Sequence, residues 1–433
     1  MRPHDEQSLP TDASLSDESD DAWELLPDPQ VLPQQLQRRT NERRVFHLVR
    51  QRGPISRASL ARVTGMSNQT IGTIVAGLIE QGLVEETGIE SRPGAGRNPM
   101  GLKVRPEGAL AFGCTIERDR IDGAWIDLSG APVVSQSLSI NSNEDPQRTV
   151  QRVEELYAQL TDEMPASYLV NALPAIGLGM PGPFDSATST LRNVPNFSHW
   201  EGIDPRSLFS TRWQLPIFYD NSATAAALGE AWQSTNDVAS FLYCHWGVGI
   251  GGGLVIDHRT YRGSTGNSLE LGHFPIVADG NPCDCGSRGC LEVEASVAAI
   301  LRQAADLGVE GDLDHVVAAA ASQPRIAAVL ERSGQLLARA ILGAVNLFDV
   351  DAVIIGGHHF QSVSPWMLPP IESAVRNLTM RRLVRPVTVR HSLIGEAAGA
   401  VGAASIVFDR LLPRVHFVVP AMVGALPSAN HGL

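Results

Sequence analysis

The sequence predicts an α/β body of two lobes, preceded by a small unit of helices and one hairpin. The first reason is the alternation of strand and helix signals from Pro106 onward, which is typical of α/β folds. The second is a series of capped helical segments between residues 36 and 106 that ends in a hairpin pattern. The third is length, because 433 residues are more than one domain normally holds.

The charge distribution divides the chain at similar places. The net charge is −13, yet residues 36–105 hold twelve Arg and Lys against five Asp and Glu. The first 35 residues carry nine acidic side chains and one arginine, and we expect them to be disordered because they have few apolar anchors. They form either a solvated arm or a segment that competes with DNA for the basic unit. The expected parts are an acidic tail at 1–35, a basic unit at 36–106, the α/β body at 107–408 and a C-terminal tail at 409–433.

Three short helices are predicted in the basic unit. Apolar residues at helical spacing run to Arg52, where Gly53-Pro54 ends the first helix. Ser56 is placed to cap a second helix, and Ser67 to cap a third after a turn at Gly65. The expected apolar faces are Leu60, Ala61 and Val63 in the second helix, and Ile71, Ile74, Val75, Leu78 and Ile79 in the third.

The third helix presents short polar side chains near its amino end, which is helix-turn-helix geometry. In that motif the first residues of the second helix enter the major groove of DNA, where Asn and Gln suit adenine. The segments 82–85 and 102–104 predict a winged hairpin whose basic tip contacts phosphate or the minor groove. A basic unit that binds protein instead is the alternative. The expected DNA-contacting residues are Ser67, Asn68, Gln69, Thr70, Thr73, Arg92 and Arg97.

The body contains strand and helix signals in alternation. Strands are expected at Leu110–Thr115, Ile121–Asp127, Ala175–Met180, Ile217–Tyr219, Phe241–His245, Gly249–Asp257 and Ala352–Ile355. Helices are expected at Pro146–Met164, at Ser222–Trp232 and within Ala295–Asn346.

The run from Gly263 to Glu292 combines Glu-x-Gly-His with Cys-x-Cys-x4-Cys. One imidazole and three thiolates make a complete tetrahedral set for Zn²⁺ and leave no open position, so the site would be structural. A disulfide with a spare thiol is the alternative. A cytosolic setting disfavours it, and so does the single-residue spacing, which strains a Cys283–Cys285 bridge. The expected ligands are His273, Cys283, Cys285 and Cys290.

This run, with GLGMPGPFD, VPNFSHWEG, YDNSATAAALGE, GVGIGGGLV and NLFDVDAVIIGG, resembles the ROK family of repressors, open reading frames and sugar kinases. The resemblance implies an actin-like ATPase (ribonuclease H-like) fold over roughly residues 107–408. SNQTIGTIVAGLIEQGLVEE and GRNPMGLKV resemble the DNA-binding heads of ROK regulators, which lone ROK kinases lack. The positions at which the family contacts its sugar are Asn196, Asn221, Glu270, His273 and Glu292. The alternative for Glu270 and Glu292 is that they only brace the zinc loop.

The chain departs from the ROK kinase pattern at two places. Where the family has Asn-Asp-Ala, this chain has Asn221-Ser222-Ala223, and a serine hydroxyl is not basic enough to replace the aspartate. The neighbouring Asp220 would point the other way in a strand. Thr115 stands in place of the aspartate of Asp-x-Gly-Gly-Thr, and bulky charged residues follow at 118–120, where phosphate requires close backbone approach. We therefore expect no catalytic residue.

These observations predict a regulator of sugar-metabolism genes, more a repressor than an activator. Its expected partners are a double-stranded DNA operator, a sugar or sugar derivative in the cleft, and further copies of itself in a homodimer or homotetramer. It is expected to be cytoplasmic and away from membranes, because the chain shows no signal peptide and no apolar run of about 20 residues. The alternatives are a regulator that no longer senses sugar and a sugar kinase with a displaced base.

Overall fold

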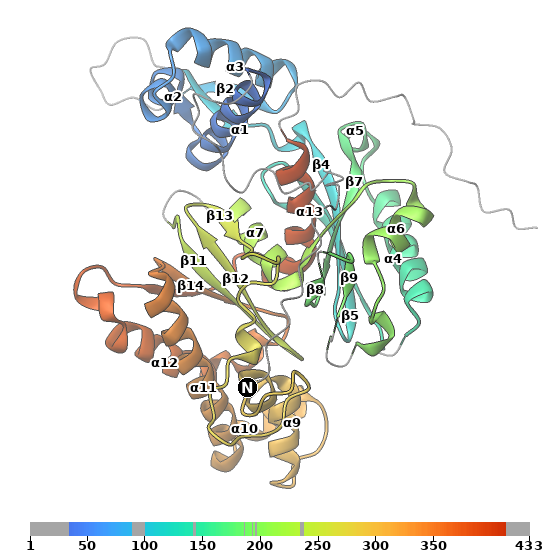
Figure 1. Cartoon of the computed structure of the whole chain (residues 1–433), viewed down its shortest axis with the longest axis vertical. Helices are drawn as coiled ribbons and strands as arrows, with labels where there is room; N and C mark the ends of the chain where they lie inside the picture. Colours follow the sequence, from blue (N-terminus) through green and yellow to red (C-terminus); the bar gives the residue numbers. More distant parts are fainter. Residues whose placement is uncertain are drawn as a thin grey trace, which may run out of the picture.

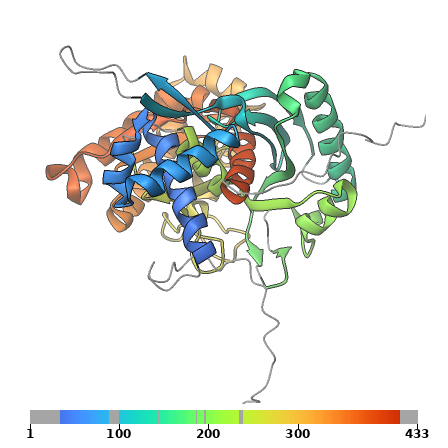
Figure 2. The same ribbon diagram turned by 90° about the horizontal axis from the view of Figure 1, so that it is seen from above.

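A small head stands above a larger body of two lobes in the computed structural model (Figure 1). The view from above places the head over the body, beside helix α13 (Figure 2). Among the helices that are described, none is long and apolar enough to span a membrane. The structure describes residues 34–88, 100–141, 144–185, 187–192, 194, 197–233 and 238–412.

The head contains three helices and a three-stranded antiparallel sheet. Ser56 accepts a hydrogen bond from the amide of Ser59, and Ser67 from that of Thr70, so both predicted caps are present. Gly65 follows the second helix with φ of 74°, a left-handed conformation that glycine adopts at no steric cost. This is the predicted winged helix-turn-helix arrangement. Its elements are α1 (Gln34–Arg52), β1 (Ile55–Ser56), α2 (Arg57–Thr64), α3 (Asn68–Glu80), β2 (Val84–Gly88) and β3 (Met100–Val104), with sheet order β1-β3-β2.

In each of α2 and α3, one residue of the predicted buried face is exposed to solvent in the structure. Val63 is 41% exposed and Ile79 is 36% exposed, whereas Leu60, Ile71 and Leu78 are buried. Successive residues on a helix point about 100° apart, so a residue at the edge of an apolar stripe turns toward solvent when the helix packs on one side only. Val63 and Ile79 occupy such edges.

The first lobe is built on a five-stranded sheet with helices beside it. Three strands form an antiparallel meander, and two later strands extend the sheet in parallel from the first of them. The strands are β4 (Leu110–Ile116), β5 (Arg120–Asp127), β6 (Pro132–Ser139), β7 (Ala172–Met180) and β10 (Ile217–Asn221), in the order β10-β7-β4-β5-β6. The other elements are α4 (Pro146–Asp162), α5 (Ala166–Leu169), α6 (Pro205–Trp213) and the hairpin of β8 (Phe184–Asp185) and β9 (Thr190–Leu191).

The second lobe repeats this topology. Its first strand is central, with antiparallel strands on one side and parallel strands on the other, which confirms the predicted actin-like, ribonuclease H-like body. The strands are β11 (Phe241–Trp246), β12 (Ile250–Ile256), β13 (Arg259–Tyr261), β14 (Ala352–Gly356) and β15 (Thr388–His391), in the order β13-β12-β11-β14-β15. The helices are α8 (Leu291–Ala295), α9 (Val297–Ala305), α10 (Leu313–Ala320), α11 (Pro324–Phe348) and α12 (Phe360–Leu378).

Two helices join the lobes. Helix α13 (Ala398–Leu411) packs on β4, β5 and β7 of the first lobe, while α7 (Ser222–Gln233) packs on β11 and β12 of the second. They also pack closely on each other: a Cβ added at Gly402 would lie 2.0 Å from the carbonyl oxygen of Ala225. The predicted body boundary at residue 408 falls inside α13. The two helices therefore form one unit that touches both lobes.

The head is docked on the far ends of the same two helices. The Arg50 guanidinium donates to the carbonyl oxygens of Ala231 and Trp232 and lies 4.3 Å from the Trp232 ring. Trp232 packs in turn on His47 of α1 and on Phe408 of α13. Arg43 pairs with Asp409 at 3.6 Å. Apolar residues of the head and of α13 belong to one buried cluster, so head and body share a continuous core.

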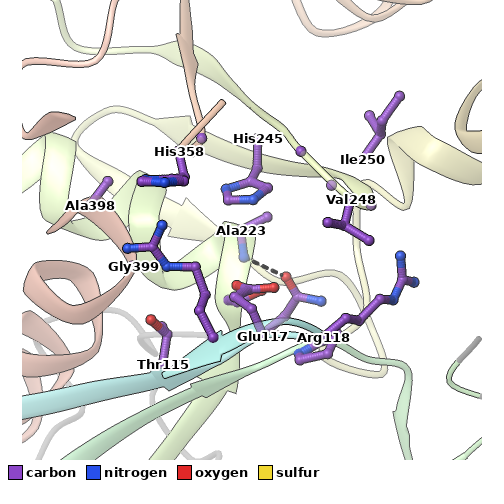
Figure 3. Close-up of a pocket in the computed structure, with 18 of the residues that line it drawn as sticks. Thr115, Glu117, Arg118, Ala223, His245, Val248, Ile250, His358, Ala398 and Gly399 are labelled. Carbon is purple, nitrogen blue, oxygen red and sulfur yellow. Dashed lines mark hydrogen bonds between the residues drawn. The ribbon is translucent and has the colours of Figure 1, made fainter. Parts of the chain in front are cut away.

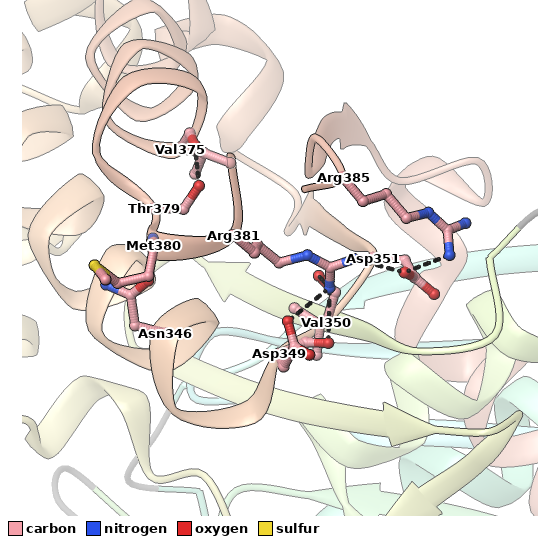
Figure 4. A network of polar contacts seen from close by, with 9 residues as sticks. All are labelled: Asn346, Asp349, Val350, Asp351, Val375, Thr379, Met380, Arg381 and Arg385. Atoms are coloured by element: carbon pink, nitrogen blue, oxygen red, sulfur yellow. Dashed lines mark hydrogen bonds and ion pairs between the residues drawn. The ribbon is translucent and has the colours of Figure 1, made fainter. Parts of the chain in front are cut away.

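A polar network fixes the turn that follows α12 (Figure 4). Arg381 donates to the carbonyl oxygens of Asp349 and Val350 at 2.8 Å each and pairs with Asp351. Arg385 pairs with the same Asp351 carboxylate at 3.3 Å. These bonds tie the turn to the beginning of β14.

Candidate functional site

The lobes enclose a polar cleft at the amino ends of α7 and α13 (Figure 3). Its open volume is about 950 Å³, which includes open solvent at its mouth. Four of the five predicted sugar-binding residues line it, and the fifth, Asn196, lies outside the described residues. The four are Asn221, Glu270, His273 and Glu292.

Glu270 lies in the loop between β13 and α8. Burial, followed by the nearby Glu292 carboxylate, raises the pKa of its carboxyl to about 7. Its Oε1 atom is buried and has no hydrogen-bond partner among the described residues. An acceptor left in this condition costs stability until a ligand or water supplies a donor.

Glu292 is already engaged on both oxygens. Oε2 accepts the amide of Ile250 at 2.9 Å, and Oε1 pairs with Arg118 at 3.3 Å. Arg118 comes from the β4–β5 turn of the first lobe, so this ion pair crosses the cleft. The carboxylate that braces the cysteine loop is a different one: Glu294 accepts the amide of Asn281 at 2.6 Å. A sugar that uses Glu292 would have to share it with Arg118.

Asn221 and Ser222 stand where β10 passes into α7. Asn221 Oδ1 caps the helix by accepting the amides of Ala223 at 2.9 Å and Thr224 at 3.3 Å. Asp220 points elsewhere, as expected from strand alternation, and pairs with Arg262 at 2.8 Å. Asp220 is therefore no replacement for a base at Ser222.

A carboxylate that the sequence reasoning missed lies beside Ser222. Glu117 follows β4 directly, lies near Ser222 and lines the cleft (Figure 3). Burial raises the pKa of this carboxyl to about 7, and neighbouring Asp122 and Asp119 act in the same direction while Arg118 opposes them. The signal available in the sequence was its position just after the carboxyl end of a central strand, where α/β folds place ligand contacts.

Replacing Glu117 with glutamine is expected to stabilise the protein at pH 8 and to change little at pH 5. The folded-state pKa of about 7 is above the ordinary 4.5, so the stability contributed by the neutral carboxyl is complete below 4.5 and is lost as pH rises through 7. Because glutamine cannot ionise, the variant should gain on the order of 2 kcal/mol in free energy of unfolding over the native protein at pH 8. Melting temperatures between pH 5 and 8 would show it. The exposed Glu155→Gln serves as control, and a stability difference that does not grow with pH contradicts the prediction.

Arginine and threonine occupy the side of the cleft next to the β4–β5 turn. Thr115 is fully buried, and a Cβ added at Gly399 would lie 2.7 Å from its Oγ1. A Cβ added at Gly249 would lie 2.5 Å from the Arg118 guanidinium, so this arginine fills the space above the glycine-rich segment 247–253. Arg120 is paired with Asp122. The loops here hold charged side chains packed on one another.

The cysteine motif forms a compact cluster. The ligand atoms of His273, Cys283, Cys285 and Cys290 all lie within 4.8 Å of one another, and this cluster could hold a metal ion. Cys283 Sγ is 3.5 Å from His273 Nδ1, and Cys285 Sγ is 3.6 Å from Cys290 Sγ. His273 also lines the cleft, so it connects the cluster to the predicted sugar site.

The predicted DNA-contacting residues of α3 share an exposed surface. Ser67, Asn68, Gln69, Thr70 and Thr73 are all exposed, opposite the buried stripe. The Ser67 hydroxyl is occupied by the cap, and Thr73 donates to the carbonyl oxygen of Gln69 at 3.1 Å. Arg92 and Arg97 lie outside the described residues. Asn68 and Gln69 carry the amide side chains on this exposed surface.

Part of the basic excess of the head is used internally. Arg43 and Arg50 face the body, and Arg57 and Lys103 pair with Glu86 and Glu85 at 2.6 and 2.9 Å. The charge that remains for a nucleic acid is therefore smaller than the sequence count indicates.

The repeated α/β lobes and the cleft between them define a sugar-kinase-like body, which carries a head of three helices and a three-stranded sheet. Residues 112–410 match the model of the ROK family, and the chain belongs to this family.

Its relatives include regulators and kinases. The chain is 28% identical over 387 residues to the xylose repressor of Bacillus subtilis, covering 89% of this chain and 99% of that protein. It is 30% identical over 296 residues to the glucokinase of Thermotoga maritima, covering 64% of this chain and 90% of the kinase. A solved ROK family transcriptional regulator, a homologue of the Escherichia coli Mlc protein, has the same fold with a TM-score of 0.66 and 24% identity, covering 86% of this chain and 96% of that chain.

Proposed function

We propose that this protein is a sugar-responsive transcriptional repressor whose kinase-like cleft binds the effector. The observation that carries the proposal is that α7 and α13 each run from the cleft to the head. Ser222 at the start of α7 and Ala398 at the start of α13 line the cleft. Trp232 and Asp409 near the opposite ends contact α1. The similarity to the xylose repressor along nearly its whole length supports the same function.

Effector binding would act on the head through these two helices. A sugar that contacts both Asn221 in the first lobe and Glu270 in the second would change how the lobes close. Because α7 and α13 pack against each other and on different lobes, a change in closure displaces their far ends, where α1 is held. An allosteric coupling of this kind is typically worth about 1–3 kcal/mol, or about 5–150-fold in DNA affinity.

Replacing Arg50 with glutamine is expected to weaken the effector response while operator binding persists. The substitution removes the bonds to the carbonyl oxygens at the end of α7 and the contact with the Trp232 ring. The ratio of operator dissociation constants with and without sugar should fall severalfold toward one. Fluorescence anisotropy with labelled operator measures this ratio. Arg148→Gln, at an exposed position of α4, is the control with the same charge change. An unaltered ratio in Arg50→Gln would contradict the proposed route.

The metal that suits the cysteine cluster is zinc. Tetrahedral zinc with Zn–S of about 2.3 Å and Zn–N of about 2.0 Å requires S···S of about 3.8 Å and S···N of about 3.5 Å. The separations of 3.6 Å between Cys285 and Cys290 and 3.5 Å between Cys283 and His273 match these values. Four protein ligands make the site structural. With Nδ1 directed to the metal, the other ring nitrogen of His273 is the one that can reach the sugar.

The remaining parts of the proposal concern partners. Two heads of a homodimer or homotetramer would bind the half-sites of a double-stranded DNA operator in the cytoplasm, through the exposed residues of α3 and through Arg92 and Arg97 of the wing. Asn196 would add a contact to the sugar. The parts of the chain would be the acidic tail 1–35, the head 36–106, the body 107–408 and the C-terminal tail 409–433.

We also propose that the body is not an enzyme, because Ser222 replaces the base and Arg118 fills the space above Gly249. One observation favours the second candidate, a sugar kinase: Glu117 places a carboxyl with a pKa of about 7 beside Ser222, where a displaced base would stand. The similarity to the glucokinase of Thermotoga maritima is consistent with it. Release of ADP from ATP that depends on sugar, by metal-loaded protein, would establish kinase activity. If no sugar that binds the protein causes ADP release, the regulator remains the proposed function.

A further inference from the structure

The cleft carries more carboxylates than cations. Among the described residues that line it, the acidic ones are Glu117, Asp119, Asp122, Glu270 and Glu292, and the arginines are Arg118 and Arg120. Both arginines have acidic partners: Arg118 pairs with Glu292 and Arg120 with Asp122. Asp119 faces His359 at 3.9 Å. Two carboxylates, Glu117 and Glu270, have no ion pair among the described residues.

Of the two carboxylates without an ion pair, Glu117 is the one that was not predicted from the sequence. It is the first residue after β4 and stands where the ROK kinase pattern has a small glycine-rich turn. It lines the same cleft as Ser222 and Asn221, a predicted sugar contact. Burial raises its pKa to about 7, because the opposing effect of Arg118, which is paired with Glu292, is smaller than the cost of the lost water. A carboxylate in this position is suited to a positively charged group.

Glu270 supplies an independent observation that the cleft is incomplete without a ligand. Its Oε1 is buried with no hydrogen-bond partner among the described residues. The Nε atom of Arg118, in a side chain that is 9% exposed, is also buried without a partner. Unpaired donors and acceptors on residues that line one cavity indicate a ligand with both hydroxyl and charged groups.

We propose that the effector is an amino sugar whose protonated amine binds Glu117. The ring hydroxyls face Asn221, Glu270 and His273, and the ammonium group donates to the Glu117 carboxylate next to Ser222. This assignment rests on the proposed sugar-sensing function and names the class of sugar. Glu117 would then be the residue that distinguishes an amine from a hydroxyl. In a poorly solvated site an unpaired carboxylate attracts a charged ammonium group much more strongly than a neutral hydroxyl.

The same charge balance disfavours anionic effectors. A phosphorylated sugar would bring about two negative charges into a cleft whose arginines are already paired. A bare divalent cation could satisfy Glu117 but would leave the hydroxyl-binding groups without donors. An amino sugar supplies both an ammonium group for Glu117 and hydroxyls for Asn221, Glu270 and His273.

The test is calorimetric titration of the full-length, zinc-loaded protein at pH 7 with matched pairs of sugars. Each pair has the same ring and differs only in an amine or a hydroxyl at carbon 2: glucosamine with glucose, galactosamine with galactose, and mannosamine with mannose. We expect one amino sugar to bind at least about tenfold more tightly than its hydroxyl counterpart. In Glu117→Gln the preference should fall below about threefold, while the exposed Glu155→Gln retains it. A separate titration with magnesium chloride alone tests whether a divalent cation binds at Glu117 instead.

Each outcome is decisive. Equal or tighter binding of the neutral sugar overturns the amino-sugar assignment and leaves the sugar-responsive repressor intact. A preference for the amine that survives Glu117→Gln overturns the role of Glu117. Saturable magnesium binding that removes the preference overturns the assignment in favour of a cation. No binding of any sugar, with operator binding intact, overturns the sugar-sensing function itself and the assignment with it.

Discussion

Replacing Cys290 with serine is expected to remove the metal and, with it, sugar binding. Cys290 is fully buried, and its neighbours are held by backbone bonds from Ile276 to Gly289 and from Leu291 to Phe274. Serine conserves the shape but is not a zinc ligand, so the proposed zinc site would lose one of its four ligands. The metal content should fall from about one ion per chain to near zero. The melting temperature should fall by at least about 5 °C, since about 2–4 °C corresponds to 1 kcal/mol in domains of this size.

The effect on sugar binding follows from His273, which belongs both to the metal cluster and to the cleft. Metal analysis, thermal unfolding and sugar titration of the same preparation measure the loss of metal, of stability and of sugar binding separately. Cys244→Ala is the matched control, because this buried thiol is outside the cluster and its loss should leave the metal content unchanged. A Cys290→Ser protein that retains one metal ion per chain would contradict the assigned ligand set.

Replacing Glu270 with alanine is expected to abolish the effector response and to leave operator binding in place. Glu270 lies in the second lobe and has a buried oxygen that none of the described residues satisfies, so it is the contact by which a sugar would draw this lobe toward Asn221. Losing it should bring the ratio of operator affinities without and with sugar from about 5–150 to near one. The ratio is measured by anisotropy across a range of sugar concentrations.

Two results would contradict this prediction. One is loss of operator binding in a Glu270→Ala protein that remains folded by circular dichroism, because the head would then depend on the cleft for its structure. The other is a full sugar response, which would place the effector elsewhere. Glu155→Ala on the exposed face of α4 controls for the loss of a carboxylate.

The fold could be predicted from the sequence because its signals are local. Strand periodicity located β4, β5, β11 and β14 to within one residue at each end, and the two serine caps placed α2 and α3. The metal cluster could be predicted for the same reason, since three of its ligands lie within eight residues of one another. Val63 and Ile79 were misjudged because the width of a buried stripe depends on which neighbours a helix packs against, and this is not a local property.

The contents of the cleft depend on contacts between distant segments. Arg118 and Glu292 are 174 residues apart, and nothing in either neighbourhood indicates that they form an ion pair. Glu117 and Ser222 meet only because β4 and β10 end at the same edge of one sheet. The docking of Arg50 on Trp232 likewise joins segments 182 residues apart. The predicted absence of a base at Ser222 followed from local sequence, but the carboxylate that lies beside it did not.

The central claim is that a sugar bound in the cleft controls the DNA affinity of the head. The most direct measurement is binding of the full-length protein to DNA from upstream of its own gene, at two salt concentrations, with and without a panel of neutral and amino sugars. We expect strongly salt-dependent binding to a site with two related halves, weakened at least about fivefold by one sugar. Specific binding that no sugar alters would contradict it, because the cleft and the head would then be uncoupled.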